Sequence, residues 1–296
     1  MIFVKDRTVF RLLLPVALLI AAIVSTPHGQ TVDHTRAQVL SLKLGSKLMN
    51  REMPYRVVLP PQYSDPKARF GNIPVVYLLH GLTGHFDNWT DKTKLGEYAT
   101  THRVIIVTPE GGNGWYTDSV SVANDKYESY IVKELIPEID KKYRTVADRR
   151  GRVIAGLSMG GYGAIKFGLK YPEMFSLAGS FSGALGATTF TEKNAGNIGK
   201  GIDTIFGPID SDARYSNDIF KMIREMSPEK QKSLPFIYVS CGTEDFLFQN
   251  NRDFNALLIE KKVAHEYREL PGGHTWTFWD DQIREFLAVA ERRSQK

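Results

Sequence analysis

The sequence predicts an α/β fold with a mostly parallel central sheet and helices on both faces of that sheet. Short apolar runs alternate along the chain with helical patterns of 12–18 residues, and this order implies parallel strands joined by crossover helices. Several of the apolar runs are continuous, which is typical of strands that are buried on both faces. The 296 residues, 42% hydrophobic and 24% charged, are enough for one large globular domain.

The expected elements follow in chain order. Residues 37–44 and 55–59 alternate well enough to form an antiparallel strand pair, which Pro60 and Pro61 close. Further strands are expected at 73–79, 103–107, 151–157, 175–180, 235–241 and 265–270. Helices are expected at 126–143, 159–170, 250–262 and 277–293, where apolar residues recur at helical spacing.

Residues 1–29 should lie outside the domain as an export signal peptide. Lys5, Arg7 and Arg11 precede an uncharged apolar run of 13 residues at 12–24, and small polar residues follow it. Such a run is short for a membrane span, although an uncleaved signal would leave an inner-membrane anchor. We therefore expect an exported protein, periplasmic or extracellular, with a single domain at 35–296.

Charge and cysteine content exclude several functional classes. Without residues 1–29 the formal net charge falls from +5 to about +3, spread evenly, so no nucleic-acid partner is expected. The single Cys241 has no partner for an internal disulfide and lies in an apolar run, which indicates buried packing. The sequence contains neither a Cys/His cluster at metal-ligand spacing nor a Gly-rich phosphate loop, so no metal or cofactor is expected.

The segment Gly156-Leu157-Ser158-Met159-Gly160 lies between a predicted strand and a predicted helix. A strand that turns directly into a helix strains the residue between them, and small residues two positions to either side leave room for the turn. Ser158 should then stand above the sheet as a nucleophile, at the helix N-terminus. A Gly-rich turn that arose by chance is the alternative interpretation.

A base and an acid follow Ser158 in the chain. His274 lies after two glycines, between the last predicted strand and the last helix, and is the best placed of the seven histidines to deprotonate Ser158. Asp245 follows the strand at 235–241 and should orient the imidazole, with Glu244 as the competing acid. The order Ser, Asp, His is that of the α/β-hydrolases and differs from that of the unrelated serine proteases.

Two backbone N–H groups should stabilise the oxyanion that forms when Ser158 attacks a carbonyl. One belongs to Met159, which follows the nucleophile. The other belongs to Leu82, in the loop 80–84 that follows the strand at 73–79. His80, in the same loop, is interpreted as a structural residue and not as a second base.

Four motifs occur along the chain: LHGLTG at 79–84, GWYTDS at 114–119, GLSMGG at 156–161 and Gly273-His274. Together and in this order they resemble one esterase branch of the α/β-hydrolases, and the similarity runs from about residue 39 to 286. This branch includes esterase D (S-formylglutathione hydrolase), feruloyl, acetyl-xylan and tributyrin esterases, and the mycobacterial mycolyltransferases.

The resemblance implies an α/β-hydrolase fold, and it places the catalytic residues and oxyanion donors of the family on the residues already chosen. It also places Trp115 and Tyr116 where the family lines its acyl pocket, although aromatic residues there are equally compatible with packing.

Residues 183–217 depart from a minimal hydrolase. The segment is rich in Gly and polar residues, contains no long predicted element, and lies where such enzymes insert a cap over the site. Phe190, Ile205 and Phe206 would then project into an acyl or aromatic pocket. A surface excursion that makes no contact with substrate is the alternative.

The expected function is an exported serine carboxylesterase that acts through an acyl-enzyme on short-chain acyl, acetyl or feruloyl esters. Its substrate would be a small-molecule or carbohydrate-linked ester. Three alternatives stay open: an acyltransferase of the mycolyltransferase type, an S-formylglutathione hydrolase, and a non-catalytic binding protein with a hydrolase fold. A cytosolic thioester is harder to reconcile with an export signal, and a binding protein need not keep all three catalytic residues.

Overall fold

The computed structural model describes residues 35–64 and 71–294, and the description below is confined to them. The predicted signal peptide at 1–29 lies outside these residues. None of the helices in the described ranges is both long enough and apolar enough to cross a membrane.

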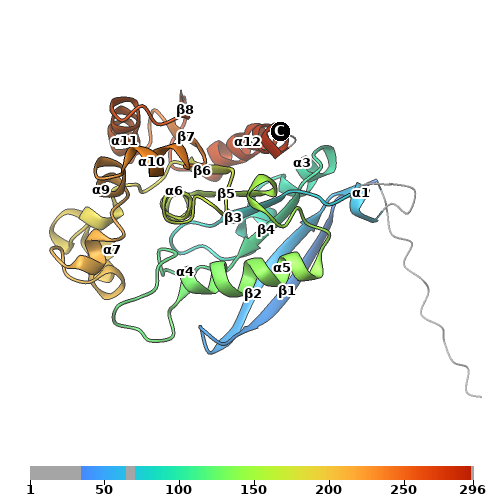
Figure 1. The fold of residues 1–296 in the computed structure, drawn as a ribbon, viewed down its shortest axis with the longest axis horizontal. Helices are drawn as coiled ribbons and strands as arrows, with labels where there is room; N and C mark the ends of the chain where they lie inside the picture. Colours follow the sequence, from blue (N-terminus) through green and yellow to red (C-terminus); the bar gives the residue numbers. More distant parts are fainter. Residues whose placement is uncertain (1–34, 65–70, 295–296) are drawn as a thin grey trace, which may run out of the picture. The chain divides into compact units, whose positions relative to one another are not determined.

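Eight strands form one sheet in the order β1-β2-β4-β3-β5-β6-β7-β8 (Figure 1). β1 and β2 pair antiparallel, β2 is antiparallel to β4, and all other pairs are parallel, which confirms the predicted mostly parallel sheet. The strands are β1 Gln38–Ser46, β2 Arg51–Leu59, β3 Val75–Leu79, β4 Ile105–Pro109, β5 Arg152–Leu157, β6 Leu177–Phe181, β7 Phe236–Gly242 and β8 His265–Leu270.

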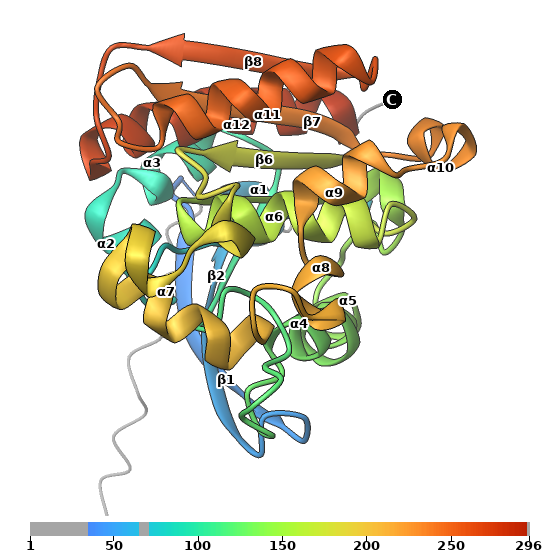
Figure 2. The same cartoon turned by 90° about the vertical axis from the view of Figure 1, so that its left-hand side faces the viewer.

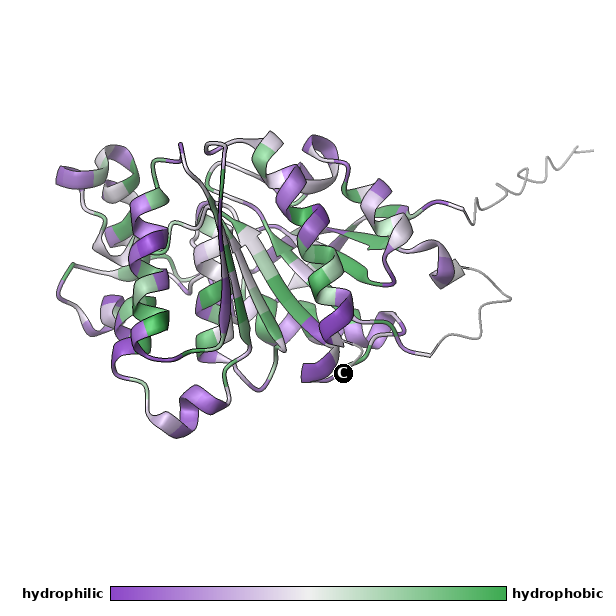
Figure 3. Cartoon of the chain, turned by 90° about the horizontal axis from the view of Figure 1, so that it is seen from above, coloured by the Kyte–Doolittle hydropathy of each residue, from purple (hydrophilic) through white to green (hydrophobic). Residues whose placement is uncertain are grey.

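Helices cover both faces of the sheet. Consecutive residues of β3 point to opposite faces, and Val75 and Tyr77 belong to one apolar core whereas Val76 and Leu78 belong to another. In Figure 3 the largely green strands lie between helices on both sides. The first core also contains apolar residues of α6 (Met159–Lys170) and α11 (Phe248–Glu260), and the second those of α3 (Leu95–Thr101) and α12 (Trp276–Ser294).

The helix predicted at 126–143 is present, and it changes its winding midway. It consists of α4 (Tyr127–Tyr130), the π-helical turn η1 (Ile131–Leu135) and α5 (Ile136–Lys142). Pro137 is the second residue after the π turn and has no N–H to donate to the preceding turn. The wider turn lets the helix pass the proline without a break.

The absence of a long element in 183–217 was a wrong expectation. α7 (Glu192–Phe206) is a helix of 15 residues with a kink at Gly196, whose φ is 54° (yellow in Figure 2). Beyond the kink, Gly199 packs so closely on the start of the helix that a Cβ there would lie 2.0 Å from the Thr191 carbonyl oxygen. Because these glycines have low helix propensity, the sequence pattern concealed the helix.

The remaining elements are short connections. They are α1 (Pro61–Ser64), α2 (Asn88–Lys92), the 3₁₀ turns η2 (Arg149–Gly151) and η3 (Ala187–Thr189), α8 (Asp212–Tyr215), α9 (Ile219–Arg224) and α10 (Pro228–Lys232). Of these, α2 lies beside the site described next.

Candidate active site

Ser158 occupies a strained turn between β5 and α6. Its φ and ψ are 53° and −116°, a conformation that side-chain-bearing residues rarely adopt. Three backbone hydrogen bonds fix it: its N–H donates to the Phe181 carbonyl, and its own carbonyl accepts from Tyr162 and Ala184. The strain is therefore stabilised by neighbouring elements, as at many functional sites.

The structure brings Ser158, His274 and Asp245 together from three loops at the carboxyl ends of strands. His274 Nε2 lies 3.0 Å from Ser158 Oγ, and His274 Nδ1 lies 2.8 Å from Asp245 Oδ2. Because a carboxylate only accepts, Nδ1 carries the proton and Nε2 is free to accept from the serine hydroxyl. This arrangement can deprotonate Ser158 and stabilise the imidazolium that results.

Glu244, the competing acid, lies in a different place. Its carboxylate accepts hydrogen bonds from the Gly272 N–H and, at 2.7 Å, from the Thr243 hydroxyl. These contacts hold the loop that carries His274 but do not involve the imidazole. Asp245 is thus the acid that contacts the base.

The Asp245 carboxyl is kept ionised by its surroundings. Burial alone would raise its pKa, but hydrogen bonds from His274 and from the Leu247 N–H outweigh burial and lower it. The side chain of Asp245 has no exposed surface, whereas that of His274 is 20% exposed. The base can therefore be reached from solvent while its acid cannot.

The predicted oxyanion donors lie on two segments that meet at Ser158. Met159 is the first residue of α6, so its N–H has no acceptor within the helix. The loop that carries Leu82 touches the nucleophile, because a Cβ on Gly81 would lie 3.4 Å from Ser158 Cβ. Gly160 permits this approach, since a Cβ there would lie 2.6 Å from the His80 carbonyl oxygen.

His80 has the structural role predicted for it. It is buried, Gly111 N–H donates to its Nε2 at 2.8 Å, and its Nδ1 lies 2.8 Å from the Gly81 carbonyl. Both ring nitrogens are thus engaged in holding the loop, which leaves none for substrate.

A cleft of about 150 Å³ opens at Ser158. Its lining residues are Gly81, Leu82, Thr83, Gly84, Asn88, Lys92, Leu157, Ser158, His274, Trp276 and Trp279. Sequence reasoning missed Lys92, Trp276 and Trp279 as lining residues. Phe246 was missed as well: it directly follows Asp245, its ring centroid lies 4.6 Å from that of His274, and it is 75% exposed.

Trp115 and Tyr116, tentatively assigned to substrate binding, are buried and are not among the residues that line this cleft. The Tyr116 hydroxyl donates to the His80 carbonyl at 2.9 Å, and Trp115 stacks edge-on against Phe190. The positions of both residues correspond to packing, the alternative that the sequence had left open.

The residues expected to project from 183–217 complete the same aromatic cluster. Phe206 is fully buried and its ring contacts those of Trp115 and Tyr162, while Phe190 and Ile205 are partly buried on the core. None of the three is among the residues that line the Ser158 cleft. These three side chains therefore pack on the domain and not into the cleft, as the alternative of a segment without substrate contact would have it.

A buried ion pair supports the loop at 115–117. The Lys166 ammonium donates to the Tyr116 carbonyl and to Glu128, both at 2.8 Å, and Glu128 also pairs with Lys170 at 2.7 Å. Burial lowers the pKa of Lys166 to about 8, against the opposing effect of Glu128. Burial would raise the pKa of Glu128, but the two lysines lower it to about 2.

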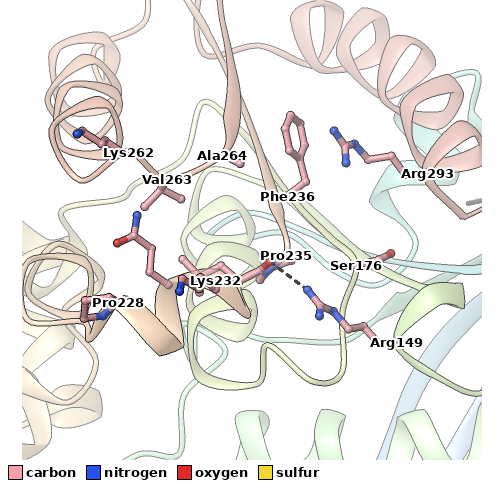
Figure 4. A pocket seen from close by; sticks show the side chains of 12 residues that line it. Arg149, Ser176, Pro228, Lys232, Pro235, Phe236, Lys262, Val263, Ala264 and Arg293 are labelled. Atoms are coloured by element: carbon pink, nitrogen blue, oxygen red, sulfur yellow. Dashed lines mark hydrogen bonds between the residues drawn. The ribbon is translucent and has the colours of Figure 1, made fainter.

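A larger hollow, of about 540 Å³, lies away from these residues (Figure 4). It is lined by Ser176 and Pro235, which precede β6 and β7, so it lies at the amino ends of the strands. Four cations line it: Arg149, Lys232, Lys262 and Arg293. Since Ser158 follows the carboxyl end of β5, this hollow does not belong to the candidate active site.

Cys241, the single cysteine of the chain, is not placed to act as a nucleophile. Cys241 is fully buried as predicted, and burial raises the pKa of its thiol to about 12. Within residues 35–64 and 71–294, no group of three or more His, Cys, Asp or Glu side chains is arranged to hold a metal ion.

Comparison with known proteins finds relatives of this chain in sequence and in fold. The model of a family described as "Putative esterase" matches residues 46–289. An acetyl esterase of Caldicellulosiruptor saccharolyticus is 30% identical over 255 residues, which cover 83% of this chain and 95% of that protein. A solved ferulic acid esterase is 28% identical with a TM-score of 0.74, covering 88% of this chain and 99% of its own. The fold also matches S-formylglutathione hydrolase from Agrobacterium tumefaciens, 20% identical with a TM-score of 0.74, over 87% of this chain and 95% of that one.

Proposed function

Since the chain belongs to the "Putative esterase" family, and is therefore a hydrolase of ester bonds with the α/β-hydrolase fold, we propose that it is an exported serine carboxylesterase. The family assignment confirms the resemblance seen in the four sequence motifs. One observation supports the serine mechanism. Ser158 Oγ, at the strained turn, lies 3.0 Å from His274 Nε2, and His274 Nδ1 lies 2.8 Å from the buried carboxylate of Asp245.

In the first half of the proposed reaction, His274 Nε2 takes the proton of Ser158 as Oγ attacks the ester carbonyl. The carbonyl oxygen becomes an oxyanion that accepts from the N–H groups of Leu82 and Met159. When the intermediate collapses, the C–O bond to the alcohol breaks, His274 gives its proton to the departing alcohol, and the acyl group stays on Ser158.

In the second half, His274 accepts a proton from water, and the hydroxide adds to the acyl carbon. Collapse of this second intermediate breaks the bond to Ser158, returns the proton to Oγ, and releases the carboxylic acid. Asp245 remains ionised throughout and stabilises the imidazolium in both halves.

The size of the cleft favours a short acyl group. Sites that hold drug-sized ligands measure roughly 300–1,000 Å³, whereas the space at Ser158 is about 150 Å³. Acetyl and other short acyl groups fit such a space better than feruloyl. A carbohydrate-linked alcohol would have to extend out of the cleft into solvent.

Export is supported by the basic and apolar pattern of residues 5–24 in the sequence. A substrate in the periplasm or outside the cell follows from this part of the proposal.

The test is hydrolysis of 4-nitrophenyl esters from acetyl to decanoyl, with methyl ferulate and acetylated xylan added. We expect the highest kcat/KM with acetyl to butyryl esters, and we expect Ser158→Ala to reduce turnover to background. Adding a sugar or long-chain alcohol acceptor to the assay separates hydrolysis from acyl transfer. Turnover that survives in highly purified Ser158→Ala protein would rule out the serine mechanism.

A further inference from the structure

We infer that Lys92 makes the Ser158 cleft selective for esters that carry a carboxylate beside the reacting bond. This inference rests on the proposed esterase function and adds a substrate class to it. It depends on the position of Lys92, on the absence of an acidic partner among the described residues, and on the aromatic surface that holds its ammonium group.

Lys92 brings an uncompensated positive charge to the cleft. Apart from His274, it is the one titratable side chain among the lining residues, and no Asp or Glu is among them. The other lining residues are glycines, apolar or aromatic side chains, and the neutral polar groups of Thr83, Asn88 and Ser158.

Two acidic residues are engaged elsewhere: Asp91, the neighbour of Lys92 in the chain, and Asp280, which binds the backbone of Lys94. Asp91 pairs with Arg56, and Asp280 accepts from the Lys94 N–H and from the Tyr98 hydroxyl, both at 2.8 Å. In the described part of the chain, no carboxylate lies within 4.0 Å of the Lys92 ammonium. A ligand can therefore supply the counter-charge.

An aromatic wall positions this charge. The Lys92 Nζ lies 5.2 Å from the centroid of the Trp276 ring, which itself lines the cleft. Trp276 is held edge-on by Trp89 and Trp279, with centroids 5.6 and 5.2 Å away. A cation–π contact orients the ammonium without neutralising it, so the charge remains available to an anion.

Lys92 is itself exposed, so its attraction for a carboxylate acts through solvent and should weaken as the salt concentration rises. General stabilisation of the reaction intermediate by Lys92 would have a different signature. It would raise the rates of charged and neutral esters alike, since both form the same oxyanion. The ratio between matched charged and neutral esters distinguishes the two effects.

The experiment uses two matched substrate pairs. The first places the carboxylate on the acyl side: 4-nitrophenyl hemisuccinate against methyl 4-nitrophenyl succinate. The second places it on the alcohol side: 4-acetoxybenzoate against its methyl ester. For each pair the charged-to-neutral ratio of kcat/KM is measured in the wild type, Lys92→Gln, Lys92→Glu and the control Lys94→Gln, at low and high salt.

In at least one pair we expect Lys92→Gln to lower the ratio by about two- to fivefold, Lys92→Glu to lower it further, and high salt to lower it in the wild type. Lys94 is exposed and does not line the cleft, so Lys94→Gln should keep the wild-type ratio. The pair that responds shows on which side of the ester the carboxylate binds. An equal ratio in wild type and Lys92→Gln for both pairs would overturn the inference.

Failure of the esterase proposal would look different. In that case neither neutral ester would be hydrolysed in a Ser158-dependent manner. Ser158-dependent hydrolysis of the neutral esters without charge selectivity would overturn only the role of Lys92.

Discussion

At the scale of single residues, the candidate site depends on a few atoms held by many contacts. Ser158 is kept in a strained conformation that costs on the order of 1–3 kcal/mol, and backbone groups of β6 and of the loop after it hold it there. The base is fixed in the same way, because Asp245 binds one imidazole nitrogen and leaves the other for Ser158.

Asp245→Asn should leave the fold intact and lower kcat by about 10³–10⁴-fold, because an amide at this position favours the wrong tautomer of His274. Steady-state hydrolysis of 4-nitrophenyl acetate measures the loss. Glu244→Gln is the matched control and should stay within a few-fold of wild type. If Glu244→Gln instead had the larger effect, the assignment of the acid would be wrong.

The nucleophile, base and acid could be chosen from sequence because each follows a predicted strand in a recognisable local pattern. Lys92 could not, since it has no local signature and reaches the cleft only through tertiary packing. Trp276 and Phe246 lie close to catalytic residues in the chain, but their neighbours in sequence do not specify which way their rings point. The same reason explains Trp115, whose ring packs against that of Phe206, some 90 residues further along the chain, and Tyr116, whose hydroxyl donates to the His80 carbonyl.

At the scale of elements, the turn at Ser158 requires that β5 and α6 approach each other closely. A Cβ on Gly156 would lie 2.5 Å from the Gly160 carbonyl carbon, and one on Gly160 would lie 2.5 Å from the Leu79 carbonyl oxygen. Both contacts are with backbone, which cannot move aside as a flexible side chain can.

Gly160→Ala should therefore destabilise the protein by about 1–3 kcal/mol, the usual cost of overpacking, and should lower activity by displacing the loop at 80–84. Gly201→Ala in α7 is the control, because a Cβ there meets no atom within 4 Å. This change should be neutral or stabilising by up to about 1 kcal/mol. Urea unfolding measures both, and equal effects would contradict the packing argument.

The ion pair between α4 and α6 should make stability depend on pH. The pKa of Glu128 is lowered from 4.5 to about 2, so its contribution to the free energy of unfolding is complete above pH 4.5 and is lost as pH falls toward 2.

At neutral pH Glu128→Gln should lower the free energy of unfolding by about 3–5 kcal/mol, because it leaves Lys166 buried without a carboxylate partner. Glu128→Gln combined with Lys166→Met should recover much of this loss. Urea midpoints between pH 2 and 7 test both statements.

The strands and most long helices were predictable from periodicity because each buries a face at its own regular spacing. α7 was not, because its glycines weaken the pattern and its kink depends on a positive φ at Gly196. The π turn before Pro137 was not predictable either, since local sequence does not specify how a helix accommodates a proline.

At the scale of the whole molecule, parallel strands bring distant loops to one edge of the sheet. Ser158, Asp245 and His274 follow β5, β7 and β8, so their carboxyl-end loops meet although 116 residues separate the serine from the histidine. This is the common location of ligand sites in open α/β sheets.

Removal of residues 1–29 should yield a folded, active enzyme, because the predicted domain begins at 35. The kcat/KM of the shortened chain should match that of the full-length chain. In a second experiment, residues 1–29 are fused to a phosphatase that is active only outside the cytoplasm, and we expect the phosphatase to be exported. Loss of folding in the shortened chain would show that residues 1–29 belong to the domain. Failure to export the phosphatase would contradict the signal peptide.

The central claim is that Ser158 becomes acylated because His274 and Asp245 activate it. The most direct measurement is labelling with a fluorophosphonate, followed by peptide mass analysis. We predict one adduct on Ser158, formed quickly in the wild type, slowed by about 10³-fold or more in Asp245→Asn, and absent in Ser158→Ala. An adduct on another residue, or ester hydrolysis by protein that does not label at Ser158, would contradict the account.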